Sequence, residues 1–139
     1  MSDLSPIFIP IGDDADPDAM IRAAIATADA FTECFNTRDL AGMDALLHFP
    51  HVILSGERLI VWDTPGQMPV GFFEDLAGTT GWERTLYVER RPVLVNARKV
   101  HLFVDYTRNR ADGSVITRHQ NLWIVTQDSG RWGIKQRSY

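Results

Sequence analysis

The sequence predicts an α+β fold: one domain in which three N-terminal helices pack on one face of a curved antiparallel sheet. Apolar residues recur at helical spacing in the first half of the chain, and from Trp82 onward the apolar period becomes two. Turn signals divide this second half into four long strands, at Asn96-Ala97, Asp112-Gly113 and Ser129-Gly130. Helices followed by a meander of strands are typical of α+β proteins.

Two helices are predicted first. Asp16 is a candidate N-cap and Pro17 suits the first helical position, so we expect a long amphipathic helix over 17–37. Asp39 is placed to cap a short second helix that continues through Leu47, and Phe49-Pro50 should end it because the residue before a proline disfavours helical geometry.

A strand pair over 51–55 and 58–62 follows, joined at Gly56-Glu57. Thr64-Pro65 then predicts the start of a third helix that ends at Gly78. Pro92 indicates a bulge or bend in the first long strand, because proline cannot donate to a sheet ladder. The buried face of the third helix should contain Met68, Phe72, Phe73 and Leu76.

Composition places the chain among globular proteins. It has 139 residues, 45% of them hydrophobic, and 14 Lys+Arg against 18 Asp+Glu give a net charge of −4. We expect an irregular arm over 1–15 before a single domain over 16–139. Cys34 is the one cysteine, so no internal disulfide forms, and no apolar run approaches the roughly 20 residues that span a bilayer. These features favour a cytoplasmic protein without a membrane partner.

Charge is uneven along the chain, because residues 84–139 carry most of the basic side chains. A basic half can indicate nucleic-acid binding. Here the Lys and Arg residues alternate along predicted strands and form no cluster on a helix, so we expect no nucleic-acid partner.

Two segments resemble the nuclear-transport-factor-2-like superfamily, which includes ketosteroid isomerases and SnoaL-like polyketide cyclases. FTECFNTRDLAGMDALLHFPHVILSG resembles its start and DSGRWGIKQRS its last hairpin, and the layout matches over 17–138. The chain is most similar to members that carry HFPHV, TRxRADGS and RWGIxxRS patterns. The resemblance implies a SnoaL-like α+β barrel with an internal pocket. In such a fold a cone-shaped, curved sheet of antiparallel or mixed strands has the helices packed on its concave face.

The ketosteroid-isomerase residues do not carry over. The tyrosine that donates to the oxyanion in that family corresponds to Phe31, and the general-base aspartate falls on or beside Ser55. Its second aspartate corresponds to Asn121 or Leu122, and Asn121 is favoured because it keeps the charged strand positions outward. Steroid isomerisation by that mechanism is therefore not expected.

Strand register predicts which side chains face the helices. A two-residue turn at Asp112-Gly113 places Tyr106 opposite His119, Val104 opposite Asn121 and Leu102 opposite Trp123. A similar turn at Ser129-Gly130 places Gln136 opposite Trp123 and Ser138 opposite Asn121. The shared face is apolar, with its polar members gathered at one end, as in a ligand pocket.

These positions give the candidate site. His119 is the candidate proton carrier, and Tyr106 and Asn121 are candidate donors to a developing oxyanion. An alternative interpretation is that His119 and Tyr106 satisfy each other in the core. The candidate ligand-binding residues are Phe31, His51, Ser55, Trp62, Trp123, Gln136 and Ser138.

No metal or other cofactor is expected. His48 and His51 flank Phe49-Pro50, but the proline breaks any helix, and no carboxylate stands beside them at ligand spacing. On the opposite face of the sheet, Phe103, Leu122 and Ile124 form an apolar island ringed by charge, which predicts a homodimer.

The sequence therefore predicts a small-molecule pocket protein for an apolar ligand. Any reaction should use acid/base chemistry of the isomerase, cyclase or dehydratase type. The alternative is a non-catalytic dimeric binding or accessory module, whose cavity is filled by its own side chains.

Overall fold

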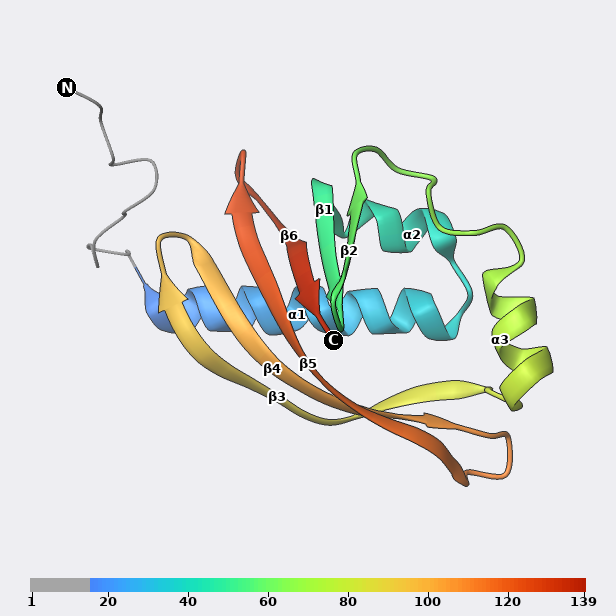
Figure 1. The fold of residues 1–139 in the computed structure, drawn as a ribbon. Coiled ribbons are helices and arrows are strands. Elements are labelled where there is room, and N and C mark those ends of the chain that lie inside the picture. Colours follow the sequence, from blue (N-terminus) through green and yellow to red (C-terminus); the bar gives the residue numbers. More distant parts are fainter. Residues whose placement is uncertain (1–15) are drawn as a thin grey trace.

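A computed structural model describes residues 16–139, so the predicted arm over 1–15 lies outside the described residues. Three helices and six strands make up this part of the chain (Figure 1). The helices are α1 (Pro17–Asn36), α2 (Leu40–Ala45) and α3 (Phe72–Thr80). The strands are β1 (Leu47–Ser55), β2 (Arg58–Trp62), β3 (Arg84–Asn96), β4 (Lys99–Asn109), β5 (Val115–Asp128) and β6 (Arg131–Ser138).

The strands form one sheet in the order β2-β1-β6-β5-β4-β3. β1 and β6 pair in parallel and all other neighbours pair antiparallel, so the predicted α+β fold with a mixed sheet is confirmed. The predicted barrel is wrong for the described residues, because β2 and β3 are the two edges of a sheet that does not close.

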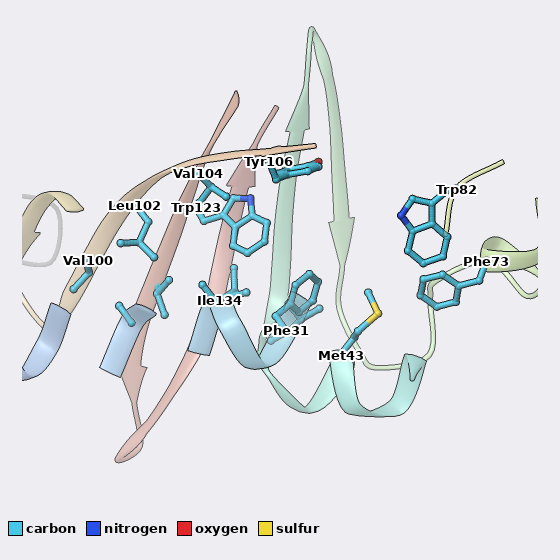
Figure 2. Packing of buried hydrophobic residues seen from close by; sticks show 14 residues of the cluster. Phe31, Met43, Phe73, Trp82, Val100, Leu102, Val104, Tyr106, Trp123 and Ile134 are labelled. Carbon is cyan, nitrogen blue, oxygen red and sulfur yellow. The ribbon is translucent and has the colours of Figure 1, made fainter. Parts of the chain in front are cut away.

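The core lies between α1 and the long strands. Ala24, Ala28 and Phe31 of α1 are buried against Leu102, Val104, Trp123 and Ile134 of the sheet (Figure 2). Phe31 meets Trp123 edge-on, with ring centroids 5.5 Å apart. Burial of apolar surface on this scale is the main stabilising contribution to a domain of this size.

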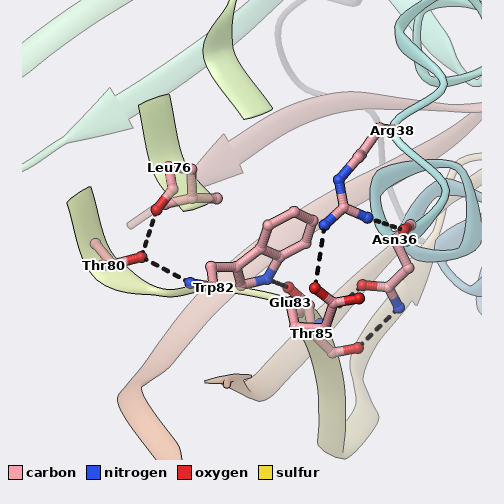
Figure 3. Close-up of polar contacts among 7 residues, drawn as sticks. All are labelled: Asn36, Arg38, Leu76, Thr80, Trp82, Glu83 and Thr85. Carbon is pink, nitrogen blue, oxygen red and sulfur yellow. Dashed lines mark hydrogen bonds and ion pairs between the residues drawn. The ribbon is translucent and has the colours of Figure 1, made fainter. Parts of the chain in front are cut away.

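Both ends of α1 are fixed by side chains. The Asp16 carboxylate accepts from the Ala19 N–H, which confirms the predicted N-cap. At the other end, Asn36 donates to the Thr85 carbonyl and accepts from the Thr85 N–H (Figure 3). The Trp82 indole N–H donates to the Thr85 hydroxyl in the same cluster, so the segment after α3 is anchored against the C-terminal end of α1.

The second helix is shorter than predicted. Asp39 caps it as expected, but it ends at Ala45, and Leu47 already belongs to β1. The reason is pairing with β6: the Ile134 N–H donates to the Leu46 carbonyl, and Leu47 is the partner of Ile134. Phe49-Pro50 therefore lies inside a strand, where the β1–β6 register shifts.

The third helix begins later than predicted. It starts at Phe72, because Gly66 and Gly71 adopt positive φ in the segment after Thr64-Pro65. It continues through Gly78 and ends at Gly81, which takes the left-handed conformation of a C-cap. Its predicted apolar face is confirmed in part: Phe73 is buried, and Phe72 and Leu76 pack on the core, whereas Met68 packs there from the segment before the helix.

Two of the three predicted turns differ in detail. The first turn is Ala97-Arg98, one residue later than predicted, and both residues have positive φ. The second is longer than two residues, since the Arg110 N–H donates to the Ser114 carbonyl. A register shift between Arg108 and Asn109 compensates, so Tyr106 does pair with His119 and Val104 with Asn121 as predicted. A further shift beside Pro92 confirms the predicted bulge.

The β5–β6 hairpin turns at Ser129-Gly130 as predicted, but its register changes near the end of β6. Val125 pairs with Ile134 and Ile124 with Gln136, which leaves Lys135 as the extra residue of a bulge. Because side chains alternate, the bulge brings Arg137 opposite Trp123 on the helix side. The predicted inward positions of Gln136 and Ser138 are therefore wrong, and Arg137 lies there instead.

Candidate functional site

A cleft of about 450 Å³ opens between the β1–β2 hairpin, the end of α1 and the segment before α3. Ser55, Trp62, Met68 and Phe72 lie on its wall. A smaller inner cavity of about 40 Å³ adjoins it, between Phe31, Thr85, Tyr106 and Trp123. The cleft has the size of an ordinary ligand site, whereas the inner cavity has room only for a few waters or a small group.

Four side chains line both spaces: Phe35, Arg108, Arg137 and Tyr139. Tyr139 is held there by its backbone N–H, which donates to the Leu54 carbonyl of β1. These four side chains are therefore the boundary between the open cleft and the inner cavity.

Arg137 is buried, with 5% of its surface exposed. Its Nε donates to His51 Nε2 at 3.0 Å and its Nη1 donates to the Tyr139 hydroxyl at 2.9 Å. The guanidinium carbon also lies over three aromatic rings, with centroid distances of 5.1 Å for Phe31 and 5.8 Å for Trp62 and Tyr139. Within residues 16–139, no carboxylate forms an ion pair with it.

His51 holds this arginine in place. Its Nδ1 lies 3.0 Å from the Ile134 carbonyl, which only accepts, so Nδ1 carries the proton and Nε2 is free to accept from Arg137. Burial and, second, the charge of Arg137 lower the pKa of His51 to about 3. His51 is thus neutral at physiological pH and supports the guanidinium without neutralising its charge.

Arg108 reaches the same boundary from β4. Its Nε is buried and has no hydrogen-bond partner in the described part of the chain. The residues that line the cleft and the inner cavity include Arg58, Arg108 and Arg137 but no Asp or Glu. The site is therefore cationic, although the whole chain is acidic.

The three candidate catalytic residues lie beside one another but do not share the cavity. Tyr106 lines the inner cavity and stacks on His119, with ring centroids 5.1 Å apart. His119 lines neither space, and its Nε2 is hydrogen-bonded to the Thr117 hydroxyl. Asn121 is buried and lines neither space.

Burial raises the pKa of Tyr106. Burial and, second, the charge of Arg108 lower the pKa of His119, which favours its neutral form. Tyr106 therefore stands between His119 and the inner cavity, and any ligand there would meet the tyrosine first.

The structure separates the candidate ligand-binding residues into four groups. Phe31 and Trp123 line the inner cavity, and Ser55 and Trp62 line the cleft. His51 lines neither and acts from behind Arg137. Gln136 and Ser138 pair with Ile124 and Leu122 on the other side of the sheet and do not reach either space.

Neither Arg108 nor Arg137 was predicted from the sequence as a site residue. A signal for Arg108 was present, because it follows Val104 and Tyr106 at the period of two that places those residues on the inner face. Arg137 gave no such signal, because regular alternation places it outward and only the bulge at Lys135 turns it inward.

His48 and His51 do not form a metal site. His48 Nε2 lies 3.0 to 3.1 Å from two carbonyls, those of Thr126 and Arg131, and its Nδ1 accepts from Arg131. Both ring nitrogens of His51 are also hydrogen-bonded. Across residues 16–139 no three His, Cys, Asp or Glu side chains gather as metal ligands. No helix in this range is both long enough and apolar enough to cross a membrane.

Comparison with solved structures identifies the fold. A Nostoc punctiforme protein of unknown function with a cystatin-like fold matches with a TM-score of 0.66 and 14% identity, covering 85% of this chain and 87% of that one. An NTF2-like protein of unknown function from Shewanella oneidensis matches with a TM-score of 0.63 and 10% identity, covering 88% and 98%. A ketosteroid isomerase-like protein from Erwinia carotovora matches with a TM-score of 0.55 and 19% identity, covering 84% and 92%.

These similarities show that the chain has the nuclear-transport-factor-2-like fold, as its sequence resemblance implied. No family model matches the sequence, and no curated protein matches it. The fold alone does not assign an activity, because one fold carries many functions.

Proposed function

We propose that this protein binds a small organic molecule in the cleft between the β1–β2 hairpin and α1, with part of the ligand reaching the inner cavity. The observation that carries the proposal is the cleft itself, about 450 Å³ in volume and lined by Phe35, Trp62 and Phe72 beside Arg137. Ligand sites combine such apolar walls with a few polar groups. We further propose that the sheet curves around the cleft as a cone, with the helices on its concave side.

Native mass spectrometry of the purified chain tests this function through a retained small molecule. Gln67 lines the cleft, so Gln67→Trp should fill it and abolish retention. Gln127 is exposed on β5 and lines neither space, so Gln127→Trp is the matched control and should retain the molecule. Equal retention by both variants would place the ligand elsewhere. The accessory-module alternative predicts that no variant, including wild type, retains or binds any small molecule.

Acid/base catalysis on the bound ligand is a second proposal, supported by the stacked pair of Tyr106 and His119. His119 is the proposed proton carrier, and Tyr106, which lines the inner cavity, is the proposed donor to the ligand. Once a substrate is known, His119→Gln should lower kcat by about 10²- to 10⁴-fold, as the loss of a general base does. Unchanged turnover with an intact fold would show that His119 only packs against Tyr106.

We also propose a homodimer that forms through the outer face of the sheet, around Phe103, Leu122 and Ile124. Supporting this, Phe103 pairs with Leu122 across β4 and β5, so the three side chains form one apolar patch.

A further inference from the structure

We infer that the ligand of this cleft carries a carboxylate, which binds between Arg137 and Arg108, and an aromatic or alicyclic body that lies against the aromatic wall. The inference rests on the proposed binding function and specifies the chemical class of the ligand. Four observations support it: an uncompensated buried charge, free guanidinium donors, a second unpaired arginine, and the chemistry of the surrounding walls.

The first observation is the charge of Arg137. A buried ion is costly unless an opposite charge or a metal accompanies it. Arg137 is 5% exposed, yet its two hydrogen-bond partners are a neutral imidazole and a phenol. Aromatic faces stabilise the cation in part, but they supply no negative charge. An anionic ligand would supply the negative charge that the partners of Arg137 in the protein lack.

The second observation concerns the remaining donors of Arg137. A guanidinium has five N–H groups, and the protein uses one on Nε and one on Nη1. No hydrogen bond from Nη2 to the described residues is present, and the side chain lines both the cleft and the inner cavity. His51 fixes the guanidinium through Nε, so the remaining N–H groups of Arg137 are preorganised to donate to a carboxylate.

The third observation is the absence of competing charge. Arg108 lines the same two spaces with a buried Nε that has no hydrogen-bond partner among residues 16–139. No acidic residue lines either space to neutralise the pair. Half-buried Arg90 does have an acidic partner, Asp29, and the buried carboxylate of Asp105 is paired with the exposed Arg118. Neither cleft arginine forms an ion pair of this kind within residues 16–139.

The fourth observation is the wall around the two arginines. Phe31, Trp62 and Tyr139 surround the Arg137 guanidinium, and Phe35 and Phe72 continue the apolar surface toward the opening. An inorganic anion would leave this surface uncovered. An aromatic carboxylate would cover it and place its charge at the deep end of the cleft.

The test compares two probes that differ only in charge, 2-naphthoate and 2-naphthamide, in titrations followed by tryptophan fluorescence of the full chain. Wild type should bind the carboxylate about 10- to 100-fold more tightly than the amide, as expected for a charge-assisted hydrogen-bond pair. Arg137→Gln should remove that preference and leave the affinity for the amide within about twofold, because only the interaction with charge is lost.

Three further variants complete the test. Arg108→Gln should weaken naphthoate binding by about tenfold, and it keeps the experiment informative if Arg137→Gln does not fold. Arg137→Lys should recover part of the preference, because it keeps the charge but loses the guanidinium fork. Arg22→Gln is the charge-matched control on the exposed surface of α1 and should bind both probes as wild type does.

The outcomes separate the two claims. Equal affinity of wild type for the two probes, or unchanged naphthoate binding in both Arg137→Gln and Arg108→Gln, overturns the carboxylate inference and leaves the binding function intact. Failure of both probes to bind, together with no retained molecule in native mass spectrometry, overturns the binding function and the inference with it.

Discussion

His51 must be neutral to make both of its hydrogen bonds. It donates from Nδ1 to the Ile134 carbonyl and accepts at Nε2 from Arg137, so a second ring proton would face an arginine at 3.0 Å. This repulsion, added to burial, explains why its pKa is lowered to about 3. A lysine or a carboxylate at this position could not satisfy both neighbours, because one lacks an acceptor and the other lacks a donor.

A pH dependence of stability follows from this pKa. Below pH 6.5 the unfolded chain binds a proton at His51 that the folded chain does not bind until about pH 3. The contribution of His51 to the free energy of unfolding is therefore fully present above pH 6.5. It falls as the pH drops, by about 1.4 kcal/mol per pH unit well below pH 6.5. Urea unfolding at pH 7, 6 and 5 measures this slope.

His51→Gln is the comparison for that measurement. The variant lacks the titrating group, so its free energy of unfolding should decline less steeply between pH 6 and pH 5 than that of wild type. The other titratable groups are common to both proteins, so their contributions cancel in the difference. Identical slopes would mean that His51 titrates normally in the folded state.

Element by element, local sequence signals predicted the boundaries that depend on local chemistry. The Asp16 and Asp39 caps and the Ser129-Gly130 turn were all identified, because each depends on contacts within three or four residues. The end of α2 was missed, because the pairing of Leu47 with Ile134 joins residues that are far apart in the chain. Distant pairing overrides local propensity at such positions.

The bulge at Lys135 had the largest consequence for the site. Lys135 pairs with neither neighbouring strand. On β5, Val125 pairs with Ile134 and the next residue, Ile124, pairs with Gln136. On β1, Leu47 pairs with Ile134 and the next paired residue, Val52, pairs with Gln136. A bulge of this kind changes which face every later side chain meets. Sequence alternation correctly predicted that Trp123 and Tyr106 face inward, because the β4–β5 ladder is regular over these residues. It failed for Arg137, because the bulge at Lys135 precedes that residue in β6.

Deletion of Lys135 tests this interpretation at the level of the strand. Because Lys135 is the unpaired residue, its removal should keep Arg137 opposite Trp123, preserve 2-naphthoate binding and cost no more than about 2 kcal/mol of unfolding free energy. Deletion of Gln120, which lies in a regular part of the β4–β5 ladder, should instead abolish cooperative unfolding. Loss of naphthoate binding in a folded Lys135 deletion would show that the bulge itself, and not only the register, shapes the site.

Over the whole molecule, the two faces of the sheet differ in what they present. The inner face combines the apolar core with the cationic cleft, while the outer face carries the apolar patch of Phe103, Leu122 and Ile124 among charged side chains. Alternation predicted the apolar inner face and the outer patch, but it did not predict the arginines of the cleft. The parallel pairing of β1 with β6, which places His51 behind Arg137, could not be predicted because no local pattern specifies which distant strand a segment joins.

The outer patch leads to the prediction for the assembled protein. Phe103, Leu122 and Ile124 are half-buried in the single chain, and the Arg91 guanidinium lies over the Phe103 ring, so the patch has the apolar centre and charged edge of an interface. His101, which pairs with Ile124, has a buried Nε2 without a partner in the described chain. A second copy of the same face would cover the apolar centre and offer hydrogen-bond partners at its edge.

Light scattering of wild type, Leu122→Asp and Leu59→Asp tests this dimer. Wild type should have twice the 15.7 kDa mass of the chain, and Leu122→Asp should have the mass of one chain, because an unpaired carboxylate in an apolar interface is strongly unfavourable. Leu59 is 63% exposed on the edge strand β2, so Leu59→Asp adds the same charge away from the patch and should remain dimeric. A wild-type protein with the mass of one chain, or a Leu122→Asp variant that stays dimeric, would exclude this face as the interface.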